Sequence, residues 1–217
     1  MERDCLLKII YLESVDSTQK YLKNLLKSKT VKAPYGVSAE LQTSGQGSRD
    51  NKWIGSYGNL YLSFAIKLSD LPKDLKIESA SIYFAYILKM TLDESSSKVW
   101  IKWPNDFYLK NLKVGGMITN IVNDSLVCGV GLNLLDSPQK YSKLDINICK
   151  KELIENYFAK IEKKILWKQV FSKYRLEFNL NKNFSTHYND SKISMQNALL
   201  NDDGSITINN ERIYSLR

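Results

Sequence analysis

The segment KVWIKWPNDFYLKNLKVGGMITNIVNDSLVCGVGLNLL, residues 98–135, holds the pattern that decides the fold. Short apolar runs rich in Val, Ile, Tyr and Trp alternate with turn residues, among them Pro104, Asn105, Asn111 and a Gly-Gly pair. Runs of this kind between turn signals are typical of β-strands joined by short connections. The segment therefore predicts three or four antiparallel strands.

Toward the N-terminus the chain reads as strand, helix and two further strands. Residues 6–12 are rich in β-formers, and Asp16 or Ser17 can cap a helix that continues to about Lys27 with apolar residues at helical spacing. Residues 35–42 and 59–68 alternate between apolar and other side chains, as strands with one buried face do.

Helices are expected on both sides of the residue 98–135 segment. Residues 77–94 carry apolar side chains at helical spacing and precede a serine run, which predicts a core helix. Residues 150–179 predict two amphipathic helices, and short alternations from residue 185 onward predict a small β module. We therefore expect an α+β protein with a mixed, mainly antiparallel sheet and packed helices, divided into domains 1–182 and 183–217.

Composition excludes several classes of protein. The 217 residues are 43% hydrophobic and 25% charged, which is ordinary for a globular protein and disfavours disorder or a coiled coil. The formal net charge of +8 has two interpretations. It is either a solvated basic surface or a surface for nucleic acid, an anionic membrane, an acidic protein or an anionic ligand.

Cysteine and histidine usage narrows the chemistry further. The three cysteines show no C-x-x-C spacing, which disfavours a disulfide framework and a zinc site and favours a reducing compartment, the cytoplasm. No apolar stretch approaches the length needed to cross a membrane. His187 is the only histidine, so a multi-His metal site is excluded and hydrolase triads are disfavoured.

A glycine-rich loop, ELQTSGQGSRDNKWIGSYGNLYL at residues 40–62, holds four of the ten glycines. Gly45 and Gly47 lie among Ser44, Ser48 and Arg49, a composition that can form an anion-binding nest of backbone N–H groups. The loop matches neither a Walker A sequence nor a dinucleotide fingerprint. A mobile connection between two strands is the alternative interpretation.

The turn after Lys102 is a second candidate site. A hairpin here places Asn105 and Asp106 near one end and Lys113 on the returning strand, where a lysine held in a pocket could offset charge on a phosphate. A solvated hairpin with surface lysines is the alternative. Downstream, the two glycines and Asn133 of CGVGLNL indicate close approach of another backbone or a ligand, or else a bulge with an asparagine at a strand end.

In this order the segments resemble the biotin protein ligases of the biotin–[acetyl-CoA carboxylase] ligase type. The resemblance extends over nearly the whole chain, and its most specific part is KWPND followed by K-x-G-G. The residues that carry it are DST at 16–18, ELQTSGQGSRDNKW at 40–53, NLYLSF at 59–64, KWPND at 102–106, KVGG at 113–116, GVGLNL at 129–134 and the terminal SLR.

The resemblance implies a class II synthetase-like catalytic domain followed by a small SH3-like β barrel. It also implies an enzyme that joins biotin to ATP, giving biotinyl-5′-AMP and pyrophosphate, and then transfers biotin to one lysine of a biotin carboxyl carrier protein. Biotin, ATP and Mg²⁺ are the expected small molecules. The expected oligomeric state is a monomer or a weak homodimer, with neither DNA nor a membrane as partner.

The resemblance also assigns site residues. Lys113 is implied as the essential lysine beside the activated carboxyl group and the α-phosphate, Arg49 as a cation for the phosphate, and Asp106 as the residue that orients Lys113 or helps to hold Mg²⁺. The implied biotin contacts are Ser17, Thr18, Gln42, Gly45, Gln46, Gly47, Lys113, Gly115 and Gly116. The implied ATP and adenylate contacts are Ser48, Arg49, Lys52, Trp53, Asn105, Asn133 and Arg217.

The chain departs from the family pattern in the glycine loop. The family loop is usually G-R-G-R-x-G-R-x-W, whereas residues 45–53 read GQGSRDNKW, with all three usual arginines replaced and Asp50 in place of a glycine. Arg49 lies one place after the arginine for which it could substitute. A weaker hold on the adenylate is the hypothesis that these substitutions suggest.

Two alternatives remain beside the ligase interpretation. Some family members carry an N-terminal DNA-binding domain, but 15 residues precede Asp16 here, so a ligase without that domain is expected and its positive charge suits ATP and an acidic carrier. A lipoate or octanoate ligase shares the fold. A basic nucleic-acid-binding module is less favoured, because Tyr214 is the only aromatic ring after Tyr188.

Overall fold

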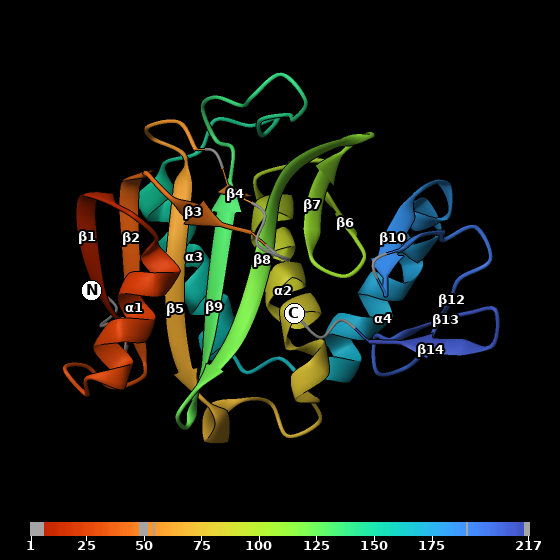
Figure 1. Cartoon of the computed structure of the whole chain (residues 1–217), viewed down its shortest axis with the longest axis horizontal. Coiled ribbons are helices and arrows are strands. Elements are labelled where there is room, and N and C mark those ends of the chain that lie inside the picture. The colour runs from red at the N-terminus through yellow and green to blue at the C-terminus, as the bar shows by residue number, and fades with distance from the viewer. Residues whose placement is uncertain (1–6, 48–51, 54, 190, 215–217) are drawn as a thin grey trace.

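The computed structural model describes residues 7–47, 52, 53, 55–189 and 191–214. A seven-stranded sheet forms its centre (Figure 1), and only its first two strands pair in parallel, all other neighbours being antiparallel. In spatial order the strands are β1 (Lys8–Val15), β2 (Tyr35–Gln42), β5 (Leu60–Lys67), β9 (Ser125–Leu132), β8 (Leu112–Val122), β7 (Asp106–Leu109) and β6 (Trp100–Lys102). The expected mixed, mainly antiparallel sheet is confirmed, and residues 98–135 form four antiparallel strands.

Helix α1 (Thr18–Lys27) covers the face of the sheet that Figure 1 shows in front. It begins where expected, because the Ser17 side chain caps it by accepting a hydrogen bond from the backbone N–H of Lys20. Leu22 and Leu26, one helical turn apart, are buried against Val37 and other residues of the strands. This side of the sheet carries the smaller of two hydrophobic clusters.

The opposite face holds the larger core, under α2 (Ala80–Glu94) and α3 (Lys150–Glu162). Phe64 of β5 is fully buried there and lies edge-on to Phe84 of α2, with 5.6 Å between the ring centres. Burial of such a side chain contributes about 1.5–3 kcal/mol. Helix α4 (Trp167–Glu177) follows α3, so the two helices expected over residues 150–179 are confirmed. No helix among the described residues combines the length and apolar character that crossing a membrane requires.

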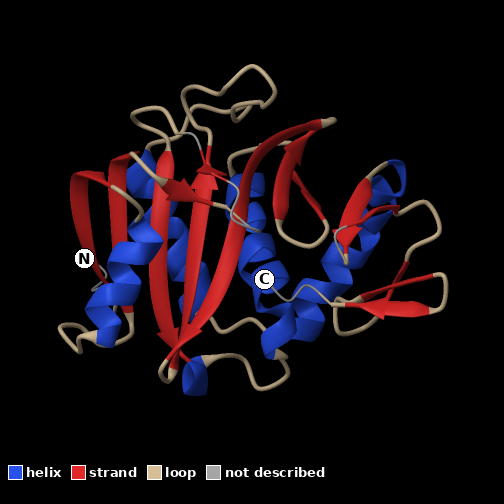
Figure 2. Cartoon of the chain, viewed as in Figure 1, coloured by secondary structure: helices blue, strands red, loops and turns tan. Residues whose placement is uncertain are grey.

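The C-terminal strands form two small sheets at one end of the main sheet (Figure 2), which confirms a small β module in this part of the chain. One pairs β10 (Ser185–Tyr188) with β11 (Ser191–Ser194), and the other joins β12 (Leu199–Leu200), β13 (Ile206–Ile208) and β14 (Glu211–Ile213). Their buried side chains belong to the same hydrophobic cluster as α2 and β5. One hydrophobic core thus spans the boundary at residues 182 and 183. The division into domains 1–182 and 183–217 stays a prediction.

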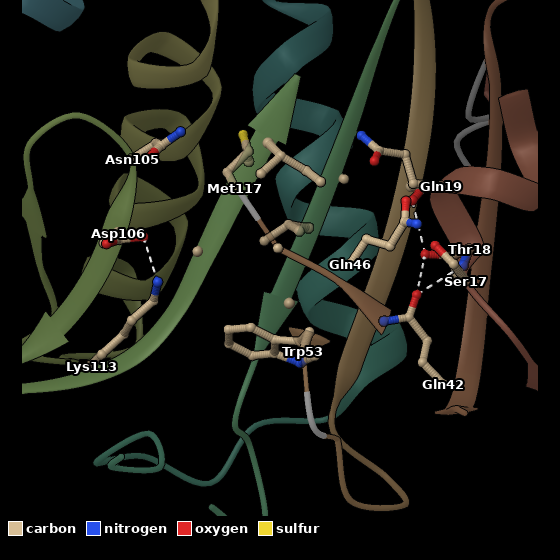
Figure 3. A pocket seen from close by; sticks show the side chains of 17 residues that line it. Ser17, Thr18, Gln19, Gln42, Gln46, Trp53, Asn105, Asp106, Lys113 and Met117 are labelled. Atoms are coloured by element: carbon tan, nitrogen blue, oxygen red, sulfur yellow. Dashed lines mark hydrogen bonds and ion pairs between the residues drawn. The ribbon is translucent and has the colours of Figure 1, made fainter. Parts of the chain in front are cut away.

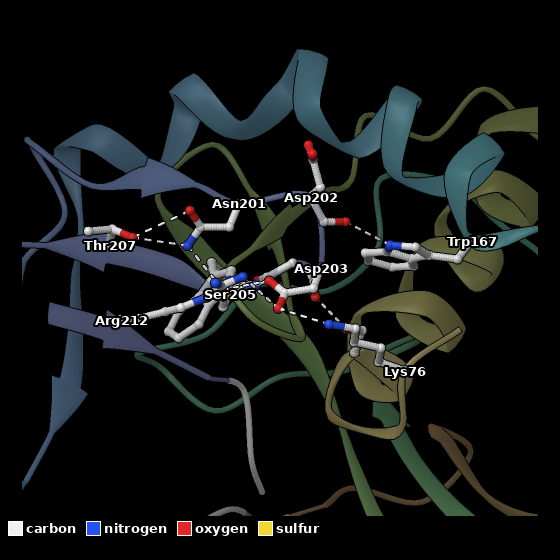
Figure 4. Close-up of polar contacts among 11 residues, drawn as sticks. Lys76, Trp167, Asn201, Asp202, Asp203, Ser205, Thr207 and Arg212 are labelled. Atoms are coloured by element: carbon white, nitrogen blue, oxygen red, sulfur yellow. Dashed lines mark hydrogen bonds and ion pairs between the residues drawn. The ribbon is translucent and has the colours of Figure 1, made fainter. Parts of the chain in front are cut away.

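A polar clasp, centred on Asp203 in the turn before β13, attaches this module to the rest of the fold through an ion pair with Lys76, at 3.8 Å (Figure 4). The Asp203 carboxylate accepts hydrogen bonds from Ser205 and Arg212, and Nη2 of Arg212 lies 2.7 Å from Oδ2. Burial raises the pKa of Asp203, but these two hydrogen bonds, together with the backbone N–H of Ser205 and the positive charge of Arg212, hold the pKa below its ordinary value. The indole N–H of Trp103 donates to the carbonyl oxygen of Gly204 at 2.8 Å, so the clasp contacts the Trp103–Asp106 turn directly.

Candidate active site

A cavity lies beside α1 on the α1 face of the sheet, over β5, β8 and β9 (Figure 3). Amide and hydroxyl side chains line one end, an ion pair lines the other, and glycines of the central strands lie between. Two short paired strands, β3 (Gly45–Gln46) and β4 (Lys52–Trp53), bring Gln46 and Trp53 into the lining. The lining residues are Ser17, Thr18, Gln19, Gln42, Gln46, Gly47, Trp53, Ser63, Asn105, Asp106, Lys113, Gly116, Met117, Ile118, Gly129, Val130 and Gly131.

The amide end, defined by Ser17, Thr18, Gln19, Gln42 and Ser63, is held by internal hydrogen bonds. The backbone N–H and the hydroxyl of Thr18 both donate to Oε1 of Gln42, at 2.8 Å and 3.0 Å. The Thr18 hydroxyl has one proton, so its 2.8 Å contact with Ser63 is a bond that Ser63 donates. The acceptor of Gln42 is thereby occupied, and the orientation of its amide is fixed with the NH₂ group left for a ligand.

Three buried nitrogen donors in the lining have no hydrogen-bond partner among the described residues. They are Nε2 of Gln19, Nε1 of Trp53 and Nδ2 of Asn105. Leaving a buried donor unsatisfied costs about 1–3 kcal/mol, so such groups are normally paired. Three unpaired donors around one cavity indicate that it is shaped for a ligand with several acceptor oxygens.

The charged end is the Asp106–Lys113 ion pair of the β7–β8 hairpin. Nζ of Lys113 lies 2.7 Å from Oδ1 of Asp106, and both side chains are about a quarter exposed, at 27% and 25%. A Cβ atom on Gly116 would lie 3.0 Å from Oδ1 of Asp106, so a glycine there leaves room for the pair. The Lys113 ammonium is also 6.0 Å from the ring centre of Trp53. This cation is held at the cavity wall, partly shielded from solvent.

Residues distant in sequence hold the turn that presents Asn105 and Asp106. The backbone N–H of Trp103 donates to Oδ1 of Asn181 at 2.7 Å, and Asn181 is fully buried. On the other side of the turn, the N–H of Met117 donates to the carbonyl oxygen of Asn105 at 3.0 Å. Asn181 is therefore a positioning residue that the sequence did not identify.

A second, smaller cavity adjoins the first across Trp53 and is lined by Lys52, Trp53, Asn133, Pro138 and Tyr141. The amide of Asn133 donates to the carbonyl oxygen of Ser142 at 3.0 Å, while its buried Oδ1 has no partner among the described residues. That oxygen is available to a ligand's N–H donor. This smaller cavity therefore offers a hydrogen-bond acceptor, whereas the first cavity offers N–H donors.

The segment after Asn133 is shaped by Asn59, another residue that no assignment included. Oδ1 of Asn59 accepts from the backbone N–H groups of Leu134 at 2.9 Å and Leu135 at 3.0 Å, and its amide donates to the Asp136 carbonyl oxygen. Asn59 is fully buried. Its signal in the sequence was its place at the head of a strong strand pattern, directly after a glycine.

Most of the assigned residues within the described part of the chain come together. Two assigned glycines do not line the cavity: a Cβ on Gly45 would meet Nε2 of Gln42 at 2.9 Å, and one on Gly115 would meet the Gly131 carbonyl oxygen at 2.4 Å. Both permit close packing behind the cavity wall. Ser48, Arg49 and Arg217 lie outside the described residues, so their assigned roles stay predictions.

The glycines of the GVGLNL segment meet one of the two expectations stated for them. A Cβ on Gly131 would lie 2.9 Å from Cε2 of Trp53, and one on Gly129 would lie 3.2 Å from Nε2 of Gln19. Both glycines line the cavity, so close approach of other groups, and not a bulge, explains them. Sequence analysis missed Gln19 and Ser63. Gln19 follows the DST motif directly, and Ser63 lies within the NLYLSF segment, but neither residue had been assigned a role.

The donor set fits a magnesium ion that arrives with a nucleotide. Asp106 is the one carboxylate that lines either cavity within the described residues, and these residues include no cluster of three or more His, Cys, Asp or Glu side chains that could hold a metal. Mg²⁺ commonly takes one or two protein carboxylates and completes its octahedron with phosphate oxygens and water. The described residues give no comparable support for a metal ion that stays bound without a nucleotide.

Comparison with known proteins gives a consistent family assignment. The sequence model of the biotin/lipoate A/B protein ligase family matches residues 11–133, which include the amide end and the ion pair. The chain is similar to the biotin acetyl coenzyme A carboxylase synthetase of Helicobacter pylori, whose crystal structure has biotinylated ATP bound. The two are 38% identical, the match covers 96% of this chain and 99% of that chain, and the TM-score is 0.92.

Two further relatives are more distant. The bifunctional ligase/repressor BirA of Escherichia coli is 30% identical over 137 residues, which cover 58% of this chain and 40% of that protein, so the match spans less than half of its length. The biotin protein ligase of Aquifex aeolicus in complex with biotin and ATP is 22% identical, with coverage of 97% and 98% and a TM-score of 0.74. At that identity the likeness shows the fold alone.

Proposed function

Because the chain belongs to the biotin/lipoate A/B protein ligase family, we propose that it activates biotin with ATP and transfers the biotinyl group to a lysine of a biotin carboxyl carrier protein. One observation carries the proposal: a single cavity joins a neutral hydrogen-bonding end to an ion pair. Biotin has the same polarity, with a ureido ring at one end and a carboxylate at the other.

The proposed orientation follows from matching these groups. The ureido ring lies at the amide end, where Gln42 and Gln19 offer N–H donors to its carbonyl oxygen. The aliphatic chain passes Val130 and the ring of Trp53. The carboxylate then reaches Lys113, whose positive charge attracts it and is held in place by Asp106.

In the first step a carboxylate oxygen of biotin forms a bond to the α-phosphorus of ATP. The bond from that phosphorus to the β-phosphate bridging oxygen breaks, and pyrophosphate leaves with the electron pair. Both reactants are anionic, so positioning and charge neutralisation supply most of the catalysis. Lys113 supplies a cation at the reacting phosphate. Magnesium, when bound with ATP, would neutralise further phosphate charge, with Asp106 as its protein carboxylate.

In the second step the amine of a carrier lysine attacks the acyl carbon of biotinyl-5′-AMP. A C–N bond forms, the C–O bond to AMP breaks, and the nitrogen loses a proton. Until the carrier arrives, the mixed anhydride needs protection from water. Trp53 supports this role, because it lies between the two cavities and so close to Gly131 that a Cβ atom there would be 2.9 Å from its ring.

The adenosine part of ATP is proposed to occupy the second cavity. Adenine carries an exocyclic NH₂ group, and the unpaired Oδ1 of Asn133 offers an acceptor for it. The rings of Trp53 and Tyr141, with centres 6.5 Å apart, provide an aromatic wall. Asn105, which the resemblance implies as an ATP or adenylate contact, lines the first cavity, where its free NH₂ group suits the carboxylate or the α-phosphate.

The cellular setting is part of the same proposal. A cytoplasmic location is supported by two described cysteines, Cys128 and Cys149, that form no disulfide. The net charge of +8 suits ATP and an acidic carrier protein. The proposal includes no DNA partner, and it takes the chain to be a monomer or a weak homodimer.

The test is product identification by mass spectrometry after the purified chain is mixed with Mg-ATP and biotin, lipoate or octanoate in separate reactions. The expected result is one equivalent of biotinyl-5′-AMP with biotin alone, and biotinylation of a carrier domain when one is added. An adenylate formed only with lipoate or octanoate would contradict the proposed substrate. Absence of any adenylate would contradict the proposed activity.

A further inference from the structure

A separate cavity, of about 210 Å³, lies on the face of the sheet opposite to the candidate active site. Its lining comes from the start of β1, the residue before β2, the end of β5 and the turn that follows β5. Helices α2 and α3, which lie behind the sheet in Figure 1, complete it. We call it the rear cavity. Among the described residues, it shares no lining residue with either cavity of the candidate active site.

Strand β5 separates the rear cavity from the first cavity. Ser63 lines the first cavity, whereas Ile66, three residues later, lines the rear cavity. Successive side chains of a strand point to opposite faces, so residues an odd number of positions apart face away from each other. The ring of Phe64 packs edge-on against Phe84 and Phe158 of the rear wall, with ring centres 5.6 Å and 5.3 Å away. The rear cavity is therefore a distinct site.

The walls of the rear cavity are apolar. Ile66, Phe84 and Phe158 contribute buried hydrocarbon and ring surface. The hydroxyl of Tyr83, which also lines the cavity, already donates to the carbonyl oxygen of Ile165 at 2.7 Å. Such walls offer a water molecule few hydrogen-bond partners, and an apolar cavity of about 150 Å³ in another protein binds benzene. The rear cavity is larger, so it has room for a short alkyl chain.

The mouth of the rear cavity carries charges of both signs. Asp70, Glu162 and Lys164 line it and are all at least partly exposed. Nζ of Lys164 lies 3.6 Å from Oδ1 of Asp70. A charged head group on a ligand, whichever its sign, would meet a like charge within this pair. A hydroxyl group both donates and accepts hydrogen bonds, so it can bond to either ion. The mouth therefore favours an uncharged head group.

We propose that the rear cavity binds an uncharged amphiphile, a molecule with an alkyl or aryl body and one hydroxyl-type head group. The body lies against Phe84 and Phe158, and the head group lies between Asp70 and Lys164. This site goes beyond the proposed ligase function, because binding there requires neither biotin nor ATP.

The test compares three probes that share one alkyl chain, hexanol, hexylammonium and hexanoate, by methyl NMR titration of the full chain at pH 7. Hexanol is expected to bind with a Kd about 5-fold or more below that of either charged probe, because a charged head group loses hydration and meets a like charge. Saturating biotin and Mg-ATP are expected to leave the Kd for hexanol unchanged. A charged probe that binds as tightly as hexanol, or displacement of hexanol by biotin, would overturn the inference.

Two variants locate the binding. Ile161→Phe extends a ring from α3 into the cavity and is expected to raise the Kd for hexanol about 10-fold or more, because the ring takes the space of the alkyl chain. Its matched control is Ile148→Phe, at a partly buried isoleucine outside the cavity, which is expected to leave the Kd unchanged.

The second variant, Lys164→Gln, leaves the apolar walls intact, so it tests the site even if Ile161→Phe does not fold. The charges that remain among the lining residues are then carboxylates, and the affinity for hexylammonium is expected to rise about 2–5-fold relative to that for hexanol. Equal hexanol affinity in Ile161→Phe and the wild type, or an unchanged preference in Lys164→Gln, would overturn the inference.

Discussion

The amide end and the charged end of the first cavity are built differently. At the amide end, Thr18, Gln42 and Ser63 satisfy one another through short hydrogen bonds, and all the groups are neutral. At the charged end, Lys113 and Asp106 form an ion pair that remains about a quarter exposed. A neutral, internally bonded site selects its ligand by shape and hydrogen bonding. A fixed cation acts most strongly where negative charge gathers during the reaction.

The largest expected effect comes from removing the cation at the charged end. In Lys113→Ala, adenylate formation is expected to slow by about 10²–10³-fold, the range measured when one electrostatic donor to a transition state is lost. The Kd for biotin is expected to rise much less than the rate falls, because the amide end is intact and only the attraction between Lys113 and the biotin carboxylate is lost. Single-turnover kinetics and calorimetry measure the two quantities. The control is Lys173→Ala on α4, and a near-normal rate in Lys113→Ala would remove this lysine from the mechanism.

The second-largest effect is expected from a substitution beside Trp53, the residue that lies between the two ends of the site. Gly131→Ala places a Cβ 2.9 Å from the rigid ring of Trp53, which must move. Because Trp53 borders both cavities, both the KM for biotin and the KM for ATP are expected to rise, and kcat/KM to fall about 10-fold or more.

Gly129→Ala is the matched control for that change. Its Cβ would meet Nε2 of Gln19 at 3.2 Å, and that atom ends a flexible side chain that can shift. Steady-state kinetics is expected to show a much smaller rise in KM, and only in the KM for biotin. Equal effects of the two substitutions would mean that Trp53 does not join the ends of the cavity.

A smaller effect is expected at the amide end itself. Thr18→Val keeps the shape of the side chain but removes the hydroxyl that bonds to Gln42 and Ser63. The KM for biotin is expected to rise about 10-fold with kcat nearly unchanged, because binding is weakened equally in the ground and transition states. Steady-state kinetics with biotin varied gives both values, with Thr91→Val as a buried control in α2. A fall in kcat at constant KM would contradict the assigned division of roles.

The smallest effect on activity is expected from the clasp that supports the charged end from behind. The pKa of Asp203 is lowered, so its contribution to stability is present above the unfolded pKa of about 3.9 and is lost as the pH falls through the folded value. Asp203→Asn is expected to lower the free energy of unfolding by about 1–3 kcal/mol at pH 7. Denaturant titrations at pH 7 and below pH 4 measure the difference, which is expected to shrink at the lower pH. A pH-independent difference would contradict this origin.

The sequence predicted well what depends on neighbours along the chain. The antiparallel strands of residues 98–135, the Ser17 cap and the core helix follow from local periodicity and turn chemistry, and the structure confirms them, although the helix expected over 77–94 begins at Ala80, after a 3-10 turn. Of the two glycines in the KVGG motif, however, only Gly116 lines the cavity. Successive residues of a strand face opposite sides, so Gly115 packs against Gly131 instead.

What the sequence could not predict depends on contacts between distant residues. Asn181 and Trp103 are 78 positions apart, and no local pattern marks a buried asparagine as the support of a turn. Asn59 accepts its hydrogen bonds from backbone groups more than 70 positions later. The contact between the rings of Tyr108 and Phe184, 76 positions apart, likewise depends on the packing of the C-terminal segment on the hairpin.

The most direct test of the division between the two ends is a crystal structure of the chain with biotin and a non-hydrolysable ATP analogue. The account predicts the ureido ring against Thr18 and Gln42, with the biotin carboxylate between Nζ of Lys113 and the α-phosphate. A ligand bound in the reverse direction, with its carboxylate at the amide end, would contradict the account.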